Sequence, residues 1–314
     1  MKIHLVVLAI AAAALPARAD MVGHGAIVNS IAVSRDGTQV ISGSWDYTVR
    51  LWDLAQRREL AVLNEHFASV NAVAFLPDGR TALSGSRDAT LKLWDLAGGT
   101  VIRTFEGHVN NIAAVAVSPD GRLAASASWD PSVKIWDIAT GRLIHTLTDH
   151  RANVNAVAFL PDGRTLISAS YDWTIRLWDV AEGTSIAVLK GHENSVNGLA
   201  VSADGRRLAS ASTDETVRLW DLETRTEIRS FAGHSGFVTA IALSPDGRTL
   251  LSGGRDRVIR LWDAETGRRL REMAGHQKPV WTVAYTPDGK RGLSAGYDEV
   301  IKVWDLETGA PAIP

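Results

Sequence analysis

The chain has 314 residues, of which 46% are hydrophobic and 22% charged, and its formal net charge is −2 at pH 7. These values are ordinary for a globular protein, and they give no basic footprint for nucleic acid. The absence of cysteine excludes disulfides, thiolate catalysis, Cys-ligated zinc and covalently attached c-type haem for this chain.

The first segment of the chain differs from everything after it. Lys2 gives it a basic start, the stretch Leu5–Leu15 is continuously apolar, and Ala-Arg-Ala ending at Ala19 has the small residues that a signal peptidase requires. An apolar run of about eleven residues is too short to cross a hydrocarbon core of roughly 30 Å. We therefore expect residues 1–19 to be a cleaved signal peptide. The mature protein should be exported, periplasmic or extracellular, and without stable membrane insertion.

Seven copies of one pattern follow at intervals of 42 residues. The dipeptide Trp-Asp begins at Trp52, Trp94, Trp136, Trp178, Trp220, Trp262 and Trp304. A histidine keeps the same register at His24, His66, His108, His150, His192, His234 and His276. An Asp-Gly turn does so at Asp36, Asp78, Asp120, Asp162, Asp204, Asp246 and Asp288. The repeats predict one domain over residues 20–314, with no linker inside it.

Each repeat is expected to form four short strands. In residues 150–191, the runs rich in β-branched and apolar residues are Val154–Phe159, Arg164–Ser170, Thr174–Trp178 and Ser185–Leu189. A Pro-Asp-Gly turn ending at Gly163 separates the first two, and Asp172 marks a tight turn before the third. One such sheet cannot bury both faces, so the sheets should stack radially and close. The prediction is an all-β fold, a seven-bladed β-propeller of four-stranded antiparallel blades.

The repeated residues resemble the signature of WD-repeat propellers over residues 23–305. In one repeat they are Gly191-His192, Ser210, Asp214 and Leu219-Trp220-Asp221. The resemblance implies that a histidine, a strand serine, a turn aspartate and the tryptophan of each blade form one hydrogen-bonded tetrad. The serines are Ser42, Ser84, Ser126, Ser168, Ser210, Ser252 and Ser294. The aspartates are Asp46, Asp88, Asp130, Asp172, Asp214, Asp256 and Asp298.

Ser, His and Asp together have the inventory of a hydrolase triad. Seven identical copies instead favour blade construction, because an active site needs one exposed constellation. A single histidine per repeat, with no His-x-x-x-His pair, likewise argues against metal binding. We therefore predict no catalytic residue, no metal and no cofactor, and expect a protein that is not an enzyme.

The ends of the predicted ring are short. Only Asp20–Val22 would precede the first repeat after signal cleavage, and Gly309–Pro314 stands where a last outer strand should run. Pro311 and Pro314 cannot donate ladder hydrogen bonds. Two interpretations stay open: one terminus supplies a short outer strand, or the edge accepts a strand from a partner.

Function should lie at positions that differ between repeats, because positions free of folding demands can serve recognition. Immediately before the turn aspartate come Trp45, Arg87, Trp129, Tyr171, Thr213, Arg255 and Tyr297. Trp, Tyr and Arg are the side chains most enriched in binding hot spots. By family resemblance this column faces the top surface, where an exposed aromatic set indicates an interface.

A second variable column comes five residues after each histidine. It consists of Asn29, Asn71, Ala113, Asn155, Asn197, Thr239 and Trp281, and by resemblance it surrounds the mouth of the central channel. Phe237 adds an aromatic side chain in the blade next to Trp281. One interpretation is an aromatic patch rimmed by amides. The other is that the asparagines satisfy loop backbone and the aromatics pack on neighbouring blades.

A third column is uniformly basic, two residues before each tryptophan. It consists of Arg50, Lys92, Lys134, Arg176, Arg218, Arg260 and Lys302. Uniformity favours a structural role, in which the aliphatic stems pack on a neighbouring strand, over a nucleic-acid groove.

These patterns predict a monomeric, non-catalytic scaffold that binds a protein or peptide, and no nucleic acid, through its top face. The predicted contacts are Trp45, Arg87, Trp129, Tyr171, Arg255, Tyr297, Phe237, Trp281, Asn29, Asn71, Asn155 and Asn197. The alternative is an accessory subunit of a periplasmic redox or hydrolytic enzyme, because residues 71–79 resemble exported bacterial propellers attached to c-type cytochromes. This chain lacks their Cys-x-x-Cys-His motif, so any electron transfer would belong to a separate polypeptide.

Overall fold

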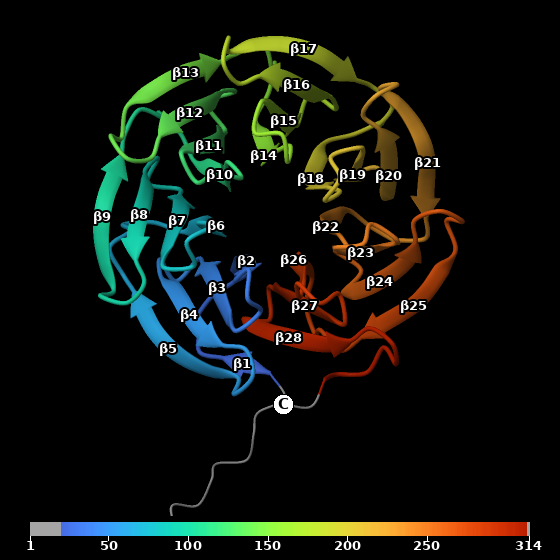
Figure 1. Cartoon of the computed structure of the whole chain (residues 1–314). Coiled ribbons are helices and arrows are strands. Elements are labelled where there is room, and N and C mark those ends of the chain that lie inside the picture. The colour runs from blue at the N-terminus through green and yellow to red at the C-terminus, as the bar shows by residue number, and fades with distance from the viewer. Residues whose placement is uncertain (1–19, 313–314) are drawn as a thin grey trace, which may run out of the picture.

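Seven four-stranded sheets surround a central axis in the computed structural model, which describes residues 20–312 (Figure 1). The strands of each sheet are antiparallel, and the predicted seven-bladed β-propeller is confirmed. The predicted signal peptide, residues 1–19, lies outside the described residues. Within the described residues, no helix is long and apolar enough to cross a membrane.

In blades 1 to 6 the strands follow the chain from the axis outward, and in blade 7 the outermost strand is β1 (Met21–Val22) (Figure 1). Blades 1 to 3 consist of β2 (Val28–Val33), β3 (Gln39–Ser44), β4 (Val49–Asp53), β5 (Arg58–Leu63), β6 (Val70–Phe75), β7 (Thr81–Ser86), β8 (Leu91–Asp95), β9 (Thr100–Phe105), β10 (Ile112–Val117), β11 (Leu123–Ser128), β12 (Val133–Asp137) and β13 (Leu143–Leu147). Blades 4 to 6 consist of β14 (Val154–Phe159), β15 (Thr165–Ser170), β16 (Ile175–Asp179), β17 (Thr184–Leu189), β18 (Val196–Val201), β19 (Arg207–Ser212), β20 (Thr216–Asp221), β21 (Thr226–Ala232), β22 (Val238–Leu243), β23 (Thr249–Gly254), β24 (Val258–Asp263) and β25 (Arg269–Ala274). Blade 7 consists of β26 (Val280–Tyr285), β27 (Arg291–Gly296), β28 (Val300–Asp305) and β1 (Met21–Val22).

The repeated turns set the strand boundaries. In blade 4 all four strands begin and end within one residue of the predicted positions. Gly163 has a φ of +65°, which glycine adopts without steric cost, and its N–H donates to the Leu160 carbonyl at 2.9 Å. Asp162 Oδ1 accepts the backbone N–H of Arg164 at 2.8 Å. The Asp-Gly pair therefore ends β14 and starts β15 as expected.

The core lies between the blades. Trp178 of blade 4 is 1% exposed and packs in one cluster with Ile135 of blade 3. Small residues allow the blades to approach closely on the inner strands. A Cβ on Gly85 would come within 2.7 Å of Ile112 Cγ2 in the next blade, so glycine fits this position.

The basic column packs within the blades, as its uniformity predicted. Lys134 Nζ donates to Thr146 Oγ1 of the neighbouring strand at 3.0 Å. The Arg176 guanidinium lies 6.0 Å from the ring centre of Trp178. These side chains are therefore used inside each sheet rather than in a shared groove.

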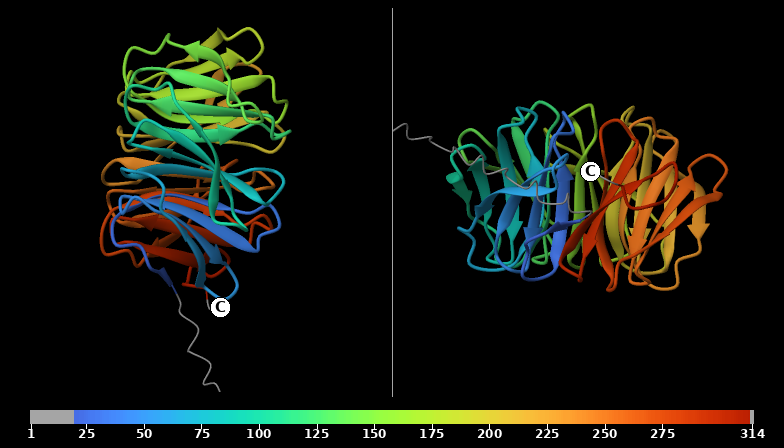
Figure 2. Two further views of the ribbon diagram at one scale, coloured as in Figure 1. Left: turned by 90° about the vertical axis from the view of Figure 1, so that its left-hand side faces the viewer. Right: turned by 90° about the horizontal axis from the view of Figure 1, so that it is seen from below.

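The ring closes between blades 7 and 1, where both described ends of the chain meet at the rim (Figures 1 and 2). β1 pairs with β28, with Met21 opposite Ile301. At the other end of β28, the Ala312 N–H donates to the Val303 carbonyl at 2.8 Å. Of the two interpretations of the sequence, an outer strand from one terminus is closer to the structure than an edge left open for a partner, but two short segments share this edge. The backbone N–H and C=O groups on the outer edge of β28 need hydrogen-bond partners along the strand. Each of the two segments pairs with the part of this edge that the other segment does not reach.

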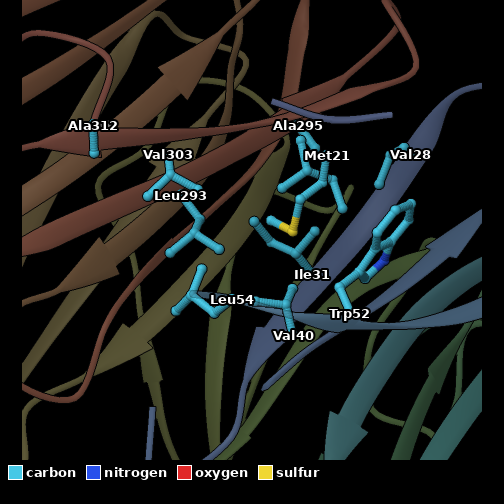
Figure 3. Close-up of a cluster of buried hydrophobic side chains, with 11 residues drawn as sticks. Met21, Val28, Ile31, Val40, Trp52, Leu54, Leu293, Ala295, Val303 and Ala312 are labelled. Carbon is cyan, nitrogen blue, oxygen red and sulfur yellow. The ribbon is translucent and has the colours of Figure 1, made fainter. Parts of the chain in front are cut away.

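The closing seam has its own hydrophobic core (Figure 3). Met21 is 1% exposed and packs with Ile31 of blade 1 and Leu293 of blade 7. Lys302 Nζ donates to Asp20 Oδ2 at 2.7 Å. The N-terminal strand therefore joins the first and last blades through a buried side chain as well as through backbone pairing.

Candidate partner-binding face

The predicted tetrad is present, and its hydrogen bonds have a defined direction. In blade 4, Trp178 Nε1–H donates to Ser168 Oγ at 2.8 Å, and Ser168 Oγ lies 2.7 Å from His150 Nε2. His150 Nδ1 lies 2.9 Å from Asp172 Oδ2. Trp can only donate and an ionised Asp can only accept, so His150 donates to Asp172 through Nδ1–H and, in its neutral form, accepts from the serine through Nε2. The other six blades carry the same bonds.

The network keeps the turn aspartates ionised. Burial raises the pKa of Asp172, but hydrogen bonds from His150, Thr174 and the Arg151 backbone outweigh it. The pKa of Asp172 therefore lies well below its ordinary value of 3.8. The pKa is lowered in the same way, with the donors of each blade, for Asp46, Asp88, Asp130, Asp214, Asp256 and Asp298.

Blades 6 and 7 lack one donor that the other blades have. A hydroxyl two residues after the aspartate bonds its carboxylate in blades 1 to 5, at Thr48, Thr90, Ser132, Thr174 and Thr216. Valine occupies this position in blades 6 and 7. In blade 6 the Arg260 guanidinium donates to Asp256 Oδ2 instead. In blade 7 no side chain of the described residues replaces the hydroxyl, so Asp298 has the fewest donors.

The tetrad geometry matches a hydrolytic triad in distance but not in access. Ser168 is fully buried, and its oxygen already accepts the Trp178 N–H. An acyl substrate could not reach a serine enclosed in this way, because attack requires an exposed nucleophile beside an oxyanion site. Among residues 20–312, no group of three or more His, Cys, Asp or Glu side chains could hold a metal ion.

The tetrads build one face of the ring. In a meander, the turn between the second and third strands lies on the same side as the connection to the next blade. Asp172 joins these two segments, because Oδ1 accepts the Thr174 N–H at 3.0 Å and Oδ2 accepts the Arg151 N–H at 3.0 Å. We call this side the top face. It consists of the aspartate turns and the loops that follow the histidines.

The first predicted column lies on this face and is largely exposed. Trp45, Trp129 and Tyr171 are 41%, 43% and 57% exposed. Arg87 and Arg255 are exposed as well, and Tyr297 is half-buried. The binding of a partner by these side chains stays a prediction.

The second column is engaged with the next blade. Asn155 Nδ2 donates to the Val196 carbonyl at 3.1 Å, and Asn197 Nδ2 donates to the Val238 carbonyl at 2.9 Å. Asn29 Nδ2 donates to Asn71 Oδ1 at 2.8 Å. These amides therefore join adjacent blades at the inner ends of the loops, and a further role in binding a partner stays a prediction.

The two aromatics predicted to form one patch each have a partner within the top face. The Arg255 guanidinium lies 4.6 Å from the ring centre of Phe237. Trp281 packs edge-to-face on Tyr297, with ring centres 5.6 Å apart. Phe237 and Trp281 thus have partners within their own blades.

Three exposed aromatic side chains of the top face were not among the contacts predicted from the sequence. Tyr47 and Trp173 follow the turn aspartate and are 51% and 52% exposed, and Phe67 follows His66 and is 86% exposed. Tyr47 and Trp173 have φ values of +72° and +70°, a region that favours glycine and costs a bulky residue free energy. Their column varies between repeats, and that variation was the available signal.

Together these residues form an aromatic crescent over blades 1 to 4. We define it as Trp45, Tyr47, Phe67, Trp129, Tyr171 and Trp173. None of the six rings has an aromatic or cation–π partner among residues 20–312. Exposed aromatic side chains without partners mark an interaction surface more strongly than rings that pack on one another.

The family described as "WD domain, G-beta repeat" matches residues 18–53, 57–95, 99–137, 141–179, 183–221, 225–263 and 267–305. The chain therefore belongs to the WD40-repeat propellers, a family of general protein-interaction scaffolds.

Short stretches of the chain are also similar to curated relatives. A stretch of 33 residues is 52% identical to the small ribosomal subunit protein RACK1 of Drosophila melanogaster and covers 10% of each chain. A stretch of 43 residues is 44% identical to the methylosome protein WDR77 of Xenopus laevis and covers 14% of this chain and 13% of that protein. The chain thus matches about a tenth of the length of these relatives.

Proposed function

We propose that the protein is a non-catalytic scaffold that binds a protein or peptide through its top face, in the periplasm or outside the cell. The observation that carries the proposal is the aromatic crescent, whose exposed rings lie on loops held rigidly by the buried tetrads. Rigid aromatic side chains bind with little loss of conformational entropy, since they have few rotatable bonds. Binding at such a surface requires no chemistry from the chain.

Two further observations support the proposal. The relatives in the short matches are named after larger assemblies, the small ribosomal subunit and the methylosome. The signal-peptide pattern of residues 1–19 supports export, because a basic start, a short apolar run and small residues precede the first blade.

Affinity capture from an envelope extract tests the proposal. The mature protein is compared with a Trp129→Ala/Tyr171→Ala variant and with a Thr213→Ala/Glu215→Ala control, which changes the matching turn of blade 5. We expect a specific protein to be captured by the parent and the control and to be lost with the crescent variant, at unchanged melting temperature. Equal capture by all three proteins, or no capture, would refute binding by the crescent.

The composition of the captured complex also distinguishes a scaffold from the alternative role, an accessory subunit of a redox or hydrolytic enzyme. An accessory subunit of a redox enzyme would bring a haem-containing protein with it, which a visible absorption spectrum detects. An accessory subunit of a hydrolase would bring hydrolytic activity that the isolated propeller lacks. A partner without either property supports a scaffold of another assembly.

A further inference from the structure

The two halves of the top face differ in charge at the loop tips. The tips are the residues on either side of each turn aspartate and the residue after each histidine. In blades 1 to 4 and the loops between them, these are Trp45, Tyr47, Phe67, Arg87, Ala89, Val109, Trp129, Pro131, Arg151, Tyr171 and Trp173. Elsewhere on the ring they include the acids Glu193, Glu215 and Glu299 beside Arg255 and Arg257. The crescent half thus has two arginines and no acid at its tips.

These two arginines are free to bind an anion. Arg87 and Arg151 are exposed, and neither guanidinium has an ion pair or hydrogen bond within residues 20–312. Arg255, in the other half, is instead stacked on Phe237. The turn aspartates of the crescent half accept hydrogen bonds from histidines and backbone, so they are already partnered.

The exposed acids of the crescent half lie toward the circumference. Glu65, Glu106 and Asp149 follow the outer strands β5, β9 and β13, and Asp149 lies 3.6 Å from the Arg176 guanidinium. An anionic ligand would therefore meet Arg87 and Arg151 nearer the axis, between aromatic rings, and would avoid the acids at the rim.

We propose that the crescent binds an extended acidic peptide segment of a partner protein, a specificity that rests on the proposed function. Its carboxylates pair with Arg87 and Arg151, and its apolar side chains lie on Trp45, Trp129 and Tyr171. Arginine suits this role because its planar guanidinium binds a carboxylate through two parallel hydrogen bonds and also stacks on aromatic rings. The order of rings and arginines around the arc fits a segment that carries both apolar and acidic residues.

A peptide array tests the specificity directly. All peptides have leucine, phenylalanine and proline at the same fixed positions. The remaining positions are Asp or Glu in the acidic set, Ser or Gln in the neutral set and Lys in the lysine set. A glycan array is probed in parallel. We expect binding to the acidic set to be about tenfold stronger than to the neutral set, weakening as salt screens the pairs. Arg87→Glu/Arg151→Glu should abolish the preference, and Arg257→Glu, at a loop tip of blade 6 outside the crescent, should leave it intact.

The outcomes separate this inference from the function on which it rests. Equal binding to the neutral set, preference for the lysine set, binding to glycans alone or no binding to any array would overturn the acidic specificity. The Arg87→Glu/Arg151→Glu variant is also used in the envelope capture. A partner that needs Trp129 and Tyr171 but ignores the arginine reversal would leave the scaffold function standing and overturn the inference. A partner lost with both variants supports both.

Discussion

The top face over blades 1 to 4 and the top face over blades 5 to 7 have the same scaffold and different surfaces. The residue after the turn aspartate has a positive φ at Trp173 in the first half and at Glu215 in the second. The exposed rings of the first half have no ring partner in the described chain, whereas in the second half Trp281 packs on Tyr297. The turn therefore makes the same backbone demand in both halves, and this demand does not account for the aromatic crescent.

Recognition explains the difference better than stability does. A tryptophan at positive φ adds strain that a glycine would avoid, and 52% of the Trp173 surface faces solvent. The tetrads beneath it hold the loop in place and allow the strain to persist. The comparison of the two halves therefore yields two kinds of test. Changes to the tetrads should alter the stability of the fold, and changes to the exposed rings should alter capture of the partner.

Acid should destabilise the tetrads in both halves of the ring, and this is the largest effect that we expect. The folded pKa of each turn aspartate lies below its ordinary value of 3.8, so its stabilising contribution is complete above about pH 5 and declines progressively as the pH falls from there toward the folded pKa. Asp298 has the fewest donors, so blade 7 should open first. Hydrogen–deuterium exchange between pH 7 and pH 3 measures this order. Simultaneous loss of protection in all seven blades would contradict it.

Removing one carboxylate should cost less than acid but should still distinguish the blades. Asp172→Ala leaves the donors of His150, Thr174 and the Arg151 backbone unpaired, and we expect a loss of about 1–3 kcal/mol in the free energy of unfolding. Asp298→Ala should cost less, because the blade has no hydroxyl donor at Val300. Urea denaturation of both variants measures the difference. Equal losses would show that the hydroxyl bond adds nothing to the tetrad.

A glycine at the strained position should separate stability from binding. Trp173→Gly relieves the positive φ, and we expect the protein to become more stable by roughly 0.5–1 kcal/mol while capture of the partner falls several-fold. Glu215→Gly is the matched control, with a φ of +69° at the same position of blade 5, and should gain stability with capture unchanged. Thermal melts and capture yields provide the two measurements. A loss of stability in Trp173→Gly would mean that the ring supports the fold.

The fold could be predicted from the sequence because every repeat contains the same turn residues and the same buried side chains. Asp162 and Gly163 fix one turn, Trp178 needs a buried partner, and seven copies in register leave few arrangements other than a ring. The closure was harder to predict, because Met21 and Ala312 lie in segments that do not repeat and pair only through the fold. The site was predicted in part. Trp173 was missed because its exposure and its positive φ depend on the turn conformation rather than on a motif.

A small effect on stability alone, with capture unchanged, is expected from restoring the missing hydroxyl of blade 7. Val300→Thr places a donor where Thr174 bonds Asp172 in blade 4, at a half-buried position opposite Val22 in β1. We expect a gain of about 0.5–1 kcal/mol and, in acid, later opening of blade 7, because one further hydrogen bond stabilises the ionised carboxylate. Val300→Ala is the control for the loss of the valine methyl groups. If Val300→Thr stabilises no more than this control, the weakness of blade 7 lies in its divided outer edge rather than in its tetrad.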